Sequence, residues 1–178
     1  MKINKILSAV IFACILSVSC SDKSSEATSE PAEKEVLDKI YLVRHAEKES
    51  GSDPVLTSEG KNRAEALAQL LKDSSIVHIY STDFKRTMET AEPLSTLIGK
   101  ETIKYDPLKL DSTASILMQN KGNQLVVGHS NTTPQLVDAL GGEPGNPINE
   151  ANEYNRIYVL SIDENQVVST IISTYGNP

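Results

Sequence analysis

The sequence predicts an α/β fold, a three-layer sandwich in which helices flank a mainly parallel sheet that closes with an antiparallel hairpin. Between residues 39 and 140, short β-branched apolar runs alternate with segments whose apolar residues recur at helical spacing, which is typical of strands joined through helices. Near the end of the chain, two strand-like runs follow one another across a short turn, as in a hairpin. Parallel strands that are covered on both faces consist of continuous apolar residues, and the predicted strands are continuous apolar runs.

Four elements are expected in the first half of this domain. An apolar, β-branched run opens it and predicts a buried strand. A capping residue, Thr57 or Ser58, then precedes apolar residues at helical spacing, and Gly99 follows a second helix as its stop signal. In chain order we expect a strand at 39–43, a helix from 57 or 58 to about 71, a strand at 76–81 and a helix at 86–98.

Six elements are expected in the second half. A short β-rich run before Pro107 predicts a strand, and Gly122 follows a short helix. Another apolar strand leads to a helix that two glycines end, and the last two runs flank a turn-rich segment at residues 163–165. In chain order we expect a strand at 101–105, a helix at 112–120, a strand at 123–127, a helix at 133–140 and strands at 156–162 and 167–173.

A leader and a linker are expected to precede the domain. Residues 1–19 have the layout of a secretory signal peptide, because Lys2 and Lys5 precede an apolar run shorter than the ~20 residues of a membrane span. The run ends at Cys20 in a pattern that resembles a bacterial lipobox, which predicts lipidation of this cysteine; ordinary cleavage that leaves it unmodified is the alternative. Residues 20–38 are polar and acidic without apolar periodicity and are predicted to form a disordered tether.

The domain itself is expected to span residues 39–178, which is enough for one core. The formal net charge of the chain is −7, which argues against nucleic-acid binding, because that function needs a basic face. Cys14 and Cys20 both fall in the leader or at its end, so the domain has no cysteine for a disulfide, a thiolate nucleophile or a zinc site. We therefore expect a protein of the cell envelope, periplasmic or at the cell surface, with a lipid on Cys20 as its membrane contact.

Charged and nucleophilic side chains follow three of the predicted strands. Arg44 and His45 follow the first strand, Arg86 comes after the second and His129 after the fourth. In open α/β sheets, ligands bind in the crevice at the carboxyl ends of the strands. The planar fork of arginine matches phosphate oxygens, and a neutral imidazole can attack phosphorus when its other ring nitrogen is held as a donor. The pattern predicts an anion site that contains a nucleophile.

Four motifs, in one order along the domain, resemble the histidine phosphatase (phosphoglycerate mutase-like) superfamily. They are LVRHAE at residues 42–47, LTSEG at 56–60, YSTDFKRTMETA at 80–91 and VVGHSN at 126–131. The resemblance implies that His45 becomes phosphohistidine, that Arg44, Arg86 and His129 bind the phosphoryl group, and that no metal or other cofactor takes part. The short interval between Arg86 and His129 leaves no room for the cap inserted in mutases and phytases, which indicates a small, cap-less branch. Ala46 stands where many members have glycine.

The proton donor departs from the family pattern. Many members carry a glutamate roughly two dozen residues beyond the second arginine, and the acid at that offset here is Asp111, which can protonate the leaving oxygen. Alternatively, Asp111 caps the helix that begins near Ser112. Asp53, Asp83 and Glu153 are weaker candidates for the acid.

Three further residues have a structural and a functional interpretation. Lys48 follows the first motif and either adds positive charge to the substrate site or is solvated. His78 lies inside the second strand without a partner in any motif and is expected to be structural. Arg156 lies near a polar stretch and is expected at the surface.

The predicted function is a metal-independent phosphatase that hydrolyses phosphomonoesters or phosphohistidine through a phosphohistidine on His45. Its partner is a small phosphorylated substrate or a phosphoprotein. Two alternatives remain: a phosphomutase, which returns the phosphoryl group to the substrate, and an inactive or slow member that binds a phosphorylated ligand as a lipoprotein. No motif selects among sugar, nucleotide, lipid and protein phosphates.

Overall fold

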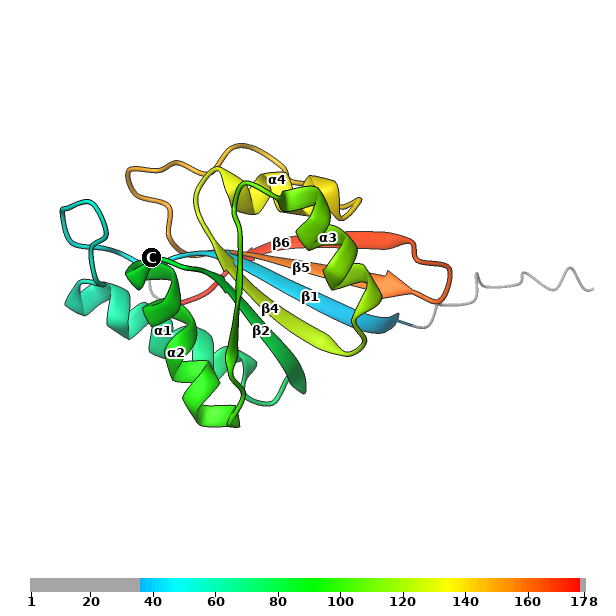
Figure 1. The fold of residues 1–178 in the computed structure, drawn as a ribbon, viewed down its shortest axis with the longest axis horizontal. Coiled ribbons are helices and arrows are strands. Elements are labelled where there is room, and N and C mark those ends of the chain that lie inside the picture. The colour runs from blue at the N-terminus through cyan, green and yellow to red at the C-terminus, as the bar shows by residue number, and fades with distance from the viewer. Residues whose placement is uncertain (1–35, 177–178) are drawn as a thin grey trace, which may run out of the picture. The chain divides into compact units, whose positions relative to one another are not determined.

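Six strands form one mixed sheet in the structure, a computed structural model that describes residues 36–176 (Figure 1). Across the sheet the strands follow the order β3-β2-β4-β1-β5-β6. Their bounds are β1 (Val36–Arg44), β2 (Ile76–Thr82), β3 (Thr102–Tyr105), β4 (Asn123–Gly128), β5 (Arg156–Asp163) and β6 (Val168–Thr174). The predicted signal peptide, Cys20 and residues 21–35 of the predicted tether lie outside the described residues.

The strand directions confirm the predicted sheet. The four strands β3, β2, β4 and β1 pair in parallel. β5 runs antiparallel to β1, and β6 pairs with β5 to complete the closing hairpin. Because the parallel strands run the same way, their carboxyl ends lie along one side of the sheet, which we call the carboxyl edge.

Two helices cover each face of the sheet (Figure 1). The helices are α1 (Ser58–Leu71), α2 (Lys85–Ile98), α3 (Leu110–Gln119) and α4 (Thr132–Ala139). Val43 of β1 belongs to a buried cluster with residues of α1 and α2, whereas Leu42 belongs to a second cluster with residues of α3 and α4. Adjacent residues of one strand thus enter opposite cores, as side-chain alternation requires, and this arrangement confirms the three-layer sandwich. Within the described residues, no helix is both long and apolar enough to cross a membrane.

All ten predicted elements are present in the predicted order, and two of their end signals are explicit. Thr57 caps α1, since its side chain accepts the Gly60 N–H at 3.0 Å. Gly99 ends α2 in the left-handed conformation, with φ of 66°, which glycine adopts without strain. These signals depend only on neighbouring residues, so they can be predicted from a short stretch of sequence.

The start of β1 differs from the prediction. The strand begins at Val36, so residues 36–38 belong to the sheet rather than to the tether. They pair with the end of β5, and Asp38 Oδ1 accepts the Gly122 N–H at 2.6 Å. These partners lie more than 80 residues away in the chain, and for this reason the local composition did not indicate them.

The start of α3 also differs. The helix begins at Leu110, and its N-cap is Lys109, without a side-chain hydrogen bond. Asp111 therefore lies in the first turn, where a carboxylate interacts favourably with the helix dipole, and the structure contradicts the interpretation of Asp111 as the cap.

Candidate active site

Four predicted side chains come together at the carboxyl edge. In the parallel pair of β1 and β4, Arg44 lies beside Gly128, and the His45 N–H donates to the Gly128 carbonyl at 2.9 Å. The imidazole rings of His45 and His129 lie 5.7 Å apart, centroid to centroid. Arg86, from the first turn of α2, brings its Nη2 to 3.4 Å from Nδ1 of His129. We call Arg44, His45, Arg86 and His129 the cradle.

His45 is held as a neutral imidazole. Its Nδ1 lies 2.7 Å from the Ala46 carbonyl oxygen, and because a carbonyl only accepts, Nδ1 carries the proton and Nε2 keeps its lone pair. Burial lowers the pKa of His45 from 6.5 to about 3, and the positive charges of Arg44 and Arg86 act in the same direction. His45 thus meets the condition for a nitrogen nucleophile.

Two threonine hydroxyls orient His129. Nε2 of His129 lies 3.0 Å from Thr82 Oγ1, which donates to Thr87 Oγ1 at 3.0 Å; Thr87 Oγ1 in turn donates to the Thr82 carbonyl at 2.8 Å. Since the proton of Thr82 is used toward Thr87, Thr82 accepts from His129, and Nε2 of His129 is protonated. Its Nδ1 then faces Arg86 with a lone pair. Burial, followed by the charges of Arg86 and Arg44, lowers the pKa of His129 to about 4.

Arg44 is anchored in the loop between α4 and β5. Its guanidinium donates to the carbonyls of Glu150 at 2.9 Å, Glu153 at 3.0 Å and Asn149 at 3.4 Å. The guanidinium carbon lies 4.0 Å from the centre of the Tyr154 ring, and that ring lies 6.1 Å from His45. Arg44 therefore fixes this loop as one wall of the cradle.

Arg156 also holds this loop in place. The sequence predicted Arg156 at the surface, but its side chain is largely buried. Its side chain is 12% exposed and forms an ion pair with Glu153 at 2.6 Å. The other carboxylate oxygen of Glu153 accepts the Asn149 N–H at 2.9 Å. Glu153, a weaker candidate for the acid, is thus engaged in holding the loop.

The start of α2 forms the opposite wall. The guanidinium carbon of Arg86 lies 4.5 Å from the centre of the Phe84 ring, whose edge meets the His129 ring at 5.1 Å. Asp53, from the loop after β1, accepts the Lys85 N–H at 3.0 Å and lies 3.8 Å from Arg86 Nη1. Arg86 is 15% exposed and Asp53 43%, so this wall is more open to solvent than the Arg44 wall.

The loop that carries His45 is tied to both helices of its face. The Ala46 N–H donates to Thr90 Oγ1 of α2 at 3.0 Å. Glu47 accepts from Nε and Nη2 of Arg63 in α1 at 2.7–2.9 Å, so its carboxylate serves packing of the loop. A Cβ on Gly60 would overlap the Glu47 carbonyl oxygen, and only glycine therefore lets α1 approach this loop so closely.

Two donors of the cradle have no acceptor. Within residues 36–176, Nε of Arg44 and Nε of Arg86 are buried and unpaired. A buried N–H without an acceptor is uncommon and costly, so an anion that accepts from both removes this cost. With two guanidinium groups and an imidazole lone pair at one place, the cradle can hold a tetrahedral oxyanion against the nucleophilic nitrogen of His45.

The other predicted residues are not part of the cradle. Asp111 is exposed on α3, and Lys48 is half-buried, with a backbone bridge to Leu56. Among the described residues, no hydrogen bond or ion pair joins Asp111 or Lys48 to the cradle. Asp83 pairs with Lys104 at 2.7 Å, on the exposed side of β3. His78 is half-buried in β2, and its ring lies 6.1 Å from Tyr80.

The sequence reasoning did not identify Thr82, Phe84 and Tyr154 as residues of the site. Thr82 and Phe84 belong to a quoted motif, but their contacts with His129 depend on the placement of β4 beside β2. Tyr154 lies in a loop without regular structure, and no periodicity or motif indicated it. Its position depends on the fold of the loop around Arg44.

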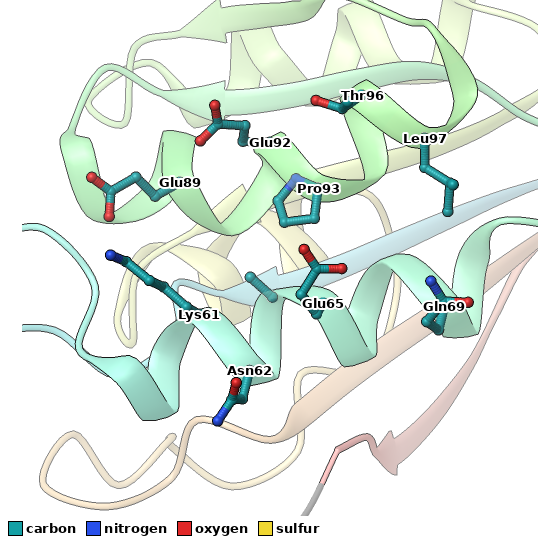
Figure 2. Close-up of a pocket in the computed structure, with 10 residues that line it drawn as sticks. Lys61, Asn62, Glu65, Gln69, Glu89, Glu92, Pro93, Thr96 and Leu97 are labelled. Atoms are coloured by element: carbon teal, nitrogen blue, oxygen red, sulfur yellow. The ribbon is translucent and has the colours of Figure 1, made fainter.

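A cavity of about 630 Å³ lies apart from the cradle, between α1 and α2 (Figure 2). Its lining includes the carboxylates of Glu65, Glu89 and Glu92, together with Lys61. Glu89 also accepts the Leu56 N–H at 2.7 Å. The acidic lining repels phosphate, so the cavity does not compete with the cradle as an anion site.

Part of the sequence matches a known protein family, and named proteins are similar to it. Residues 40–109 match the histidine phosphatase superfamily (branch 1). The protein named "Probable phosphoglycerate mutase GpmB" of Photorhabdus laumondii is 30% identical over 128 residues, which cover 67% of this chain and 58% of that protein. The matched segment is 49% of the length of the corresponding protein of Erwinia tasmaniensis, so the chain spans about half the length of such relatives.

Solved structures share the fold. The protein histidine phosphatase SixA complexed with tungstate matches with a TM-score of 0.62 at 18% identity, over 79% of this chain and 97% of that chain. The phosphoglycerate mutase of Plasmodium falciparum matches with a TM-score of 0.55 at 20% identity, over 81% and 96% of the two chains. The fold is therefore phosphoglycerate mutase-like. Given this fold, the matched family and the motifs that meet in the cradle, the chain belongs to the histidine phosphatase superfamily.

Proposed function

We propose that this protein is a metal-independent phosphatase that hydrolyses phosphomonoesters or phosphohistidine through a phosphohistidine intermediate on His45. The observation that carries the proposal is the pair of buried, unpaired Nε–H groups of Arg44 and Arg86, next to an imidazole whose Nε2 keeps its lone pair. Membership of the superfamily supports the same chemistry.

The reaction has two steps in this proposal. Nε2 of His45 attacks phosphorus, a nitrogen–phosphorus bond forms, and the bond to the leaving oxygen breaks. The guanidinium groups of Arg44 and Arg86 stabilise the negative charge on the phosphoryl oxygens. Water then attacks the phosphorus atom of the phosphohistidine, and an oxygen–phosphorus bond forms as the nitrogen–phosphorus bond breaks. Inorganic phosphate leaves with the protons of the water, which restores the neutral His45.

Asp111 is our proposed donor of the proton that the leaving oxygen needs. Asp53 is the alternative, because it lies 3.8 Å from Arg86. A group that protonates the leaving oxygen matters most for alkyl phosphates, whose alkoxide leaves poorly. We expect Asp111→Asn to lower kcat by about 100-fold for glycerol phosphate, and much less for 4-nitrophenyl phosphate. The same selective loss in Asp53→Asn, with a normal Asp111→Asn protein, would assign the role to Asp53.

A phosphomutase is the second candidate, because curated relatives are named phosphoglycerate mutases. We favour hydrolysis because only a short strand and a short helix, β3 and α3, separate α2 from β4, which supports a cradle that water can reach. Product analysis separates the two: a phosphatase releases inorganic phosphate from 3-phosphoglycerate or other esters, whereas a mutase yields an isomer of the substrate.

The intermediate gives the sharpest test. We expect the full-length protein, incubated with radiolabelled acetyl phosphate, to carry one acid-labile, alkali-stable label on His45. His45→Asn should abolish the label and lower hydrolysis by at least about 10⁴-fold. His78→Asn is the matched control and should keep both, since its ring lies in β2 beside Tyr80.

Three outcomes would contradict the proposal. A label that persists in His45→Asn would assign the nucleophile elsewhere, and loss of hydrolysis in EDTA would contradict the metal-independent mechanism. Tight phosphate binding without a label from any donor would favour the inactive, phospho-ligand-binding lipoprotein.

We further propose that the enzyme acts in the cell envelope, held at the membrane by a lipid on Cys20, on a small phosphorylated molecule or a phosphoprotein. The proposal rests on the leader pattern of residues 1–20. Cys20→Ser should move the protein from the membrane fraction to the soluble fraction, and a protein that stays with the membrane would contradict the lipid anchor.

A further inference from the structure

A cleft of about 620 Å³ opens at the carboxyl edge beside the cradle, over the ends of β2 and β3. Its volume lies within the range of about 300–1,000 Å³ in which proteins bind small molecules. The cleft is lined by Asp83, Phe84, Lys104, Tyr105, Asp106, Pro107 and Leu108. None of these residues has a role in the reaction proposed above.

Two aromatic residues connect this cleft with the cradle. Phe84 lines the cleft, and its ring also contacts His129 at 5.1 Å and Arg86 at 4.5 Å. Tyr105 lines the cleft as well, and its hydroxyl donates to the Val127 carbonyl at 3.4 Å, two residues before His129. A group attached to a phosphoryl unit in the cradle therefore reaches the cleft along the same edge of the sheet.

A firmly held loop borders the other side of the cradle. The carbonyls bound by Arg44 hold the loop of residues 149–153 against it, and Tyr154 stacks on the same guanidinium. The ion pair of Arg156 with Glu153 fixes this loop further. The more exposed wall of Arg86 and Phe84 borders the cleft, so the leaving group of a bound substrate can extend toward β2 and β3.

The chemistry of the cleft favours an uncharged, apolar leaving group. Phe84, Tyr105 and Leu108 offer apolar surface, and Leu108 is 91% exposed, so a ligand that covers it removes this surface from water. The nearby lysines already have partners, with Lys104 at 2.7 Å from Asp83 and Lys109 at 3.8 Å from Asp106. A second anionic group on the substrate therefore gains little in the cleft.

We propose that this cleft is the leaving-group subsite and that the preferred substrates are phosphomonoesters with an uncharged aromatic leaving group. This inference rests on the proposed function, since it assigns the phosphoryl group of the substrate to the cradle. Phe84 shapes both sites and couples the position of the ring to that of the phosphoryl group. Leu108 forms the outer rim and determines how much of a large ring is covered.

Equilibrium binding to full-length His45→Asn tests the subsite without turnover. We expect 2-naphthyl phosphate to bind about fivefold more tightly than phenyl phosphate, because its second ring is buried in the cleft. Leu108→Ser, added to His45→Asn, should bring this ratio close to one. Val167→Ser is the matched control, since Val167 is an exposed apolar residue, 52% exposed, in the β5–β6 turn at the other end of the sheet.

Several results would overturn the subsite. They are equal affinity for the two aryl phosphates, a ratio that Leu108→Ser leaves unchanged, or tighter binding of 3-phosphoglycerate than of 2-naphthyl phosphate. If His45→Asn binds neither the aryl phosphates nor inorganic phosphate, the cradle itself fails, and the proposed function falls together with the subsite. Wild-type hydrolysis without any preference among aryl phosphates would contradict the subsite alone.

Discussion

The two arginines of the cradle have opposite surroundings. Arg44 is 1% exposed and donates to three backbone carbonyls of one loop. Arg86 is 15% exposed, and its charged neighbour is Asp53 at 3.8 Å, on an exposed loop. Removing Arg44 leaves three carbonyls of a partly buried loop without the donor that holds them together, whereas removing Arg86 leaves a carboxylate that water can solvate.

This difference shows that two arginines of one site can have different roles: Arg44 mainly stabilises the fold of a loop, and Arg86 mainly serves ligand binding. The Arg44 wall is built before a substrate arrives, because the guanidinium is part of the fold of its loop. The Arg86 wall keeps a charged side chain available to the ligand, with a weak partner that an anion can replace. Four predictions follow this contrast, from the largest expected effect to the smallest.

Arg44→Ala should damage both stability and activity. The carbonyls of residues 149, 150 and 153 lose their donor, which we expect to lower the free energy of unfolding by about 3 kcal/mol. Hydrolysis should fall by at least about 1,000-fold, because the wall and one phosphate ligand are lost together. Urea denaturation and kcat/KM measure the two effects. A stability equal to that of the wild type would contradict the anchoring role.

Arg86→Ala should separate the two properties. We expect kcat/KM to fall by about 100-fold to 1,000-fold, because the transferring phosphoryl group loses a preorganised donor. The free energy of unfolding should change by less than about 1 kcal/mol, since the lost contacts are a long ion pair with the partly exposed Asp53, a 3.4 Å contact with His129 and a stacking contact with Phe84. A destabilisation as large as that of Arg44→Ala would remove the contrast between the walls.

The two histidines, one beside each wall, make stability depend on pH. The pKa of His45 is about 3 and that of His129 about 4 in the folded protein, both below 6.5, so at intermediate pH the unfolded chain binds more protons. This contribution to stability is complete above pH 6.5, is lost progressively as the pH falls below 6.5, and is gone once the pH has fallen through 4 for His129 and 3 for His45. Thermal unfolding at about pH 5 and about pH 7.5 should show a smaller difference in His45→Asn than in the wild type.

His78→Asn serves as the control for this pH effect and should keep the wild-type difference. An equal difference in His45→Asn and the wild type would mean that His45 is not held neutral by the fold. Bound phosphate should reduce the difference, because an anion beside the imidazoles favours their charged form.

Asp53→Asn should have the smallest effect. The amide oxygen can still accept the Lys85 N–H, while the negative charge beside Arg86 disappears. We expect inorganic phosphate to inhibit at a concentration about twofold to fivefold lower, in line with the value of an exposed ion pair. A fall in kcat by two orders of magnitude would instead identify Asp53 as the proton donor.

Sequence reasoning was most successful where the signal was local. The cap at Thr57, the left-handed stop at Gly99 and the apolar strands were all visible in short windows, and all three are present. The sequence also predicted that Arg44, His45 and His129 meet at one edge of the sheet, because parallel strands end at the same edge. One wrong prediction concerns residues whose partners lie far along the chain, since Val36–Asp38 pair with the end of β5. Arg156 pairs with Glu153, only three residues away, but its burial depends on how the loop before β5 folds, which composition does not show. The cap of α3 was misplaced by two residues, since Lys109 and not Asp111 precedes the helix.

By itself, the sequence determined the α/β class, the order of the ten elements and the four residues of the cradle. Strand composition, capping residues and motifs each lie within a short continuous segment and can be recognised there. Only the tertiary structure decided the state of those residues. The Ala46 carbonyl fixes the tautomer of His45, Thr82 and Thr87 fix that of His129, and a loop more than 100 residues away from Arg44 takes up its donors. The physical reason is that hydrogen bonds and burial depend on distances in space, which a one-dimensional pattern does not contain.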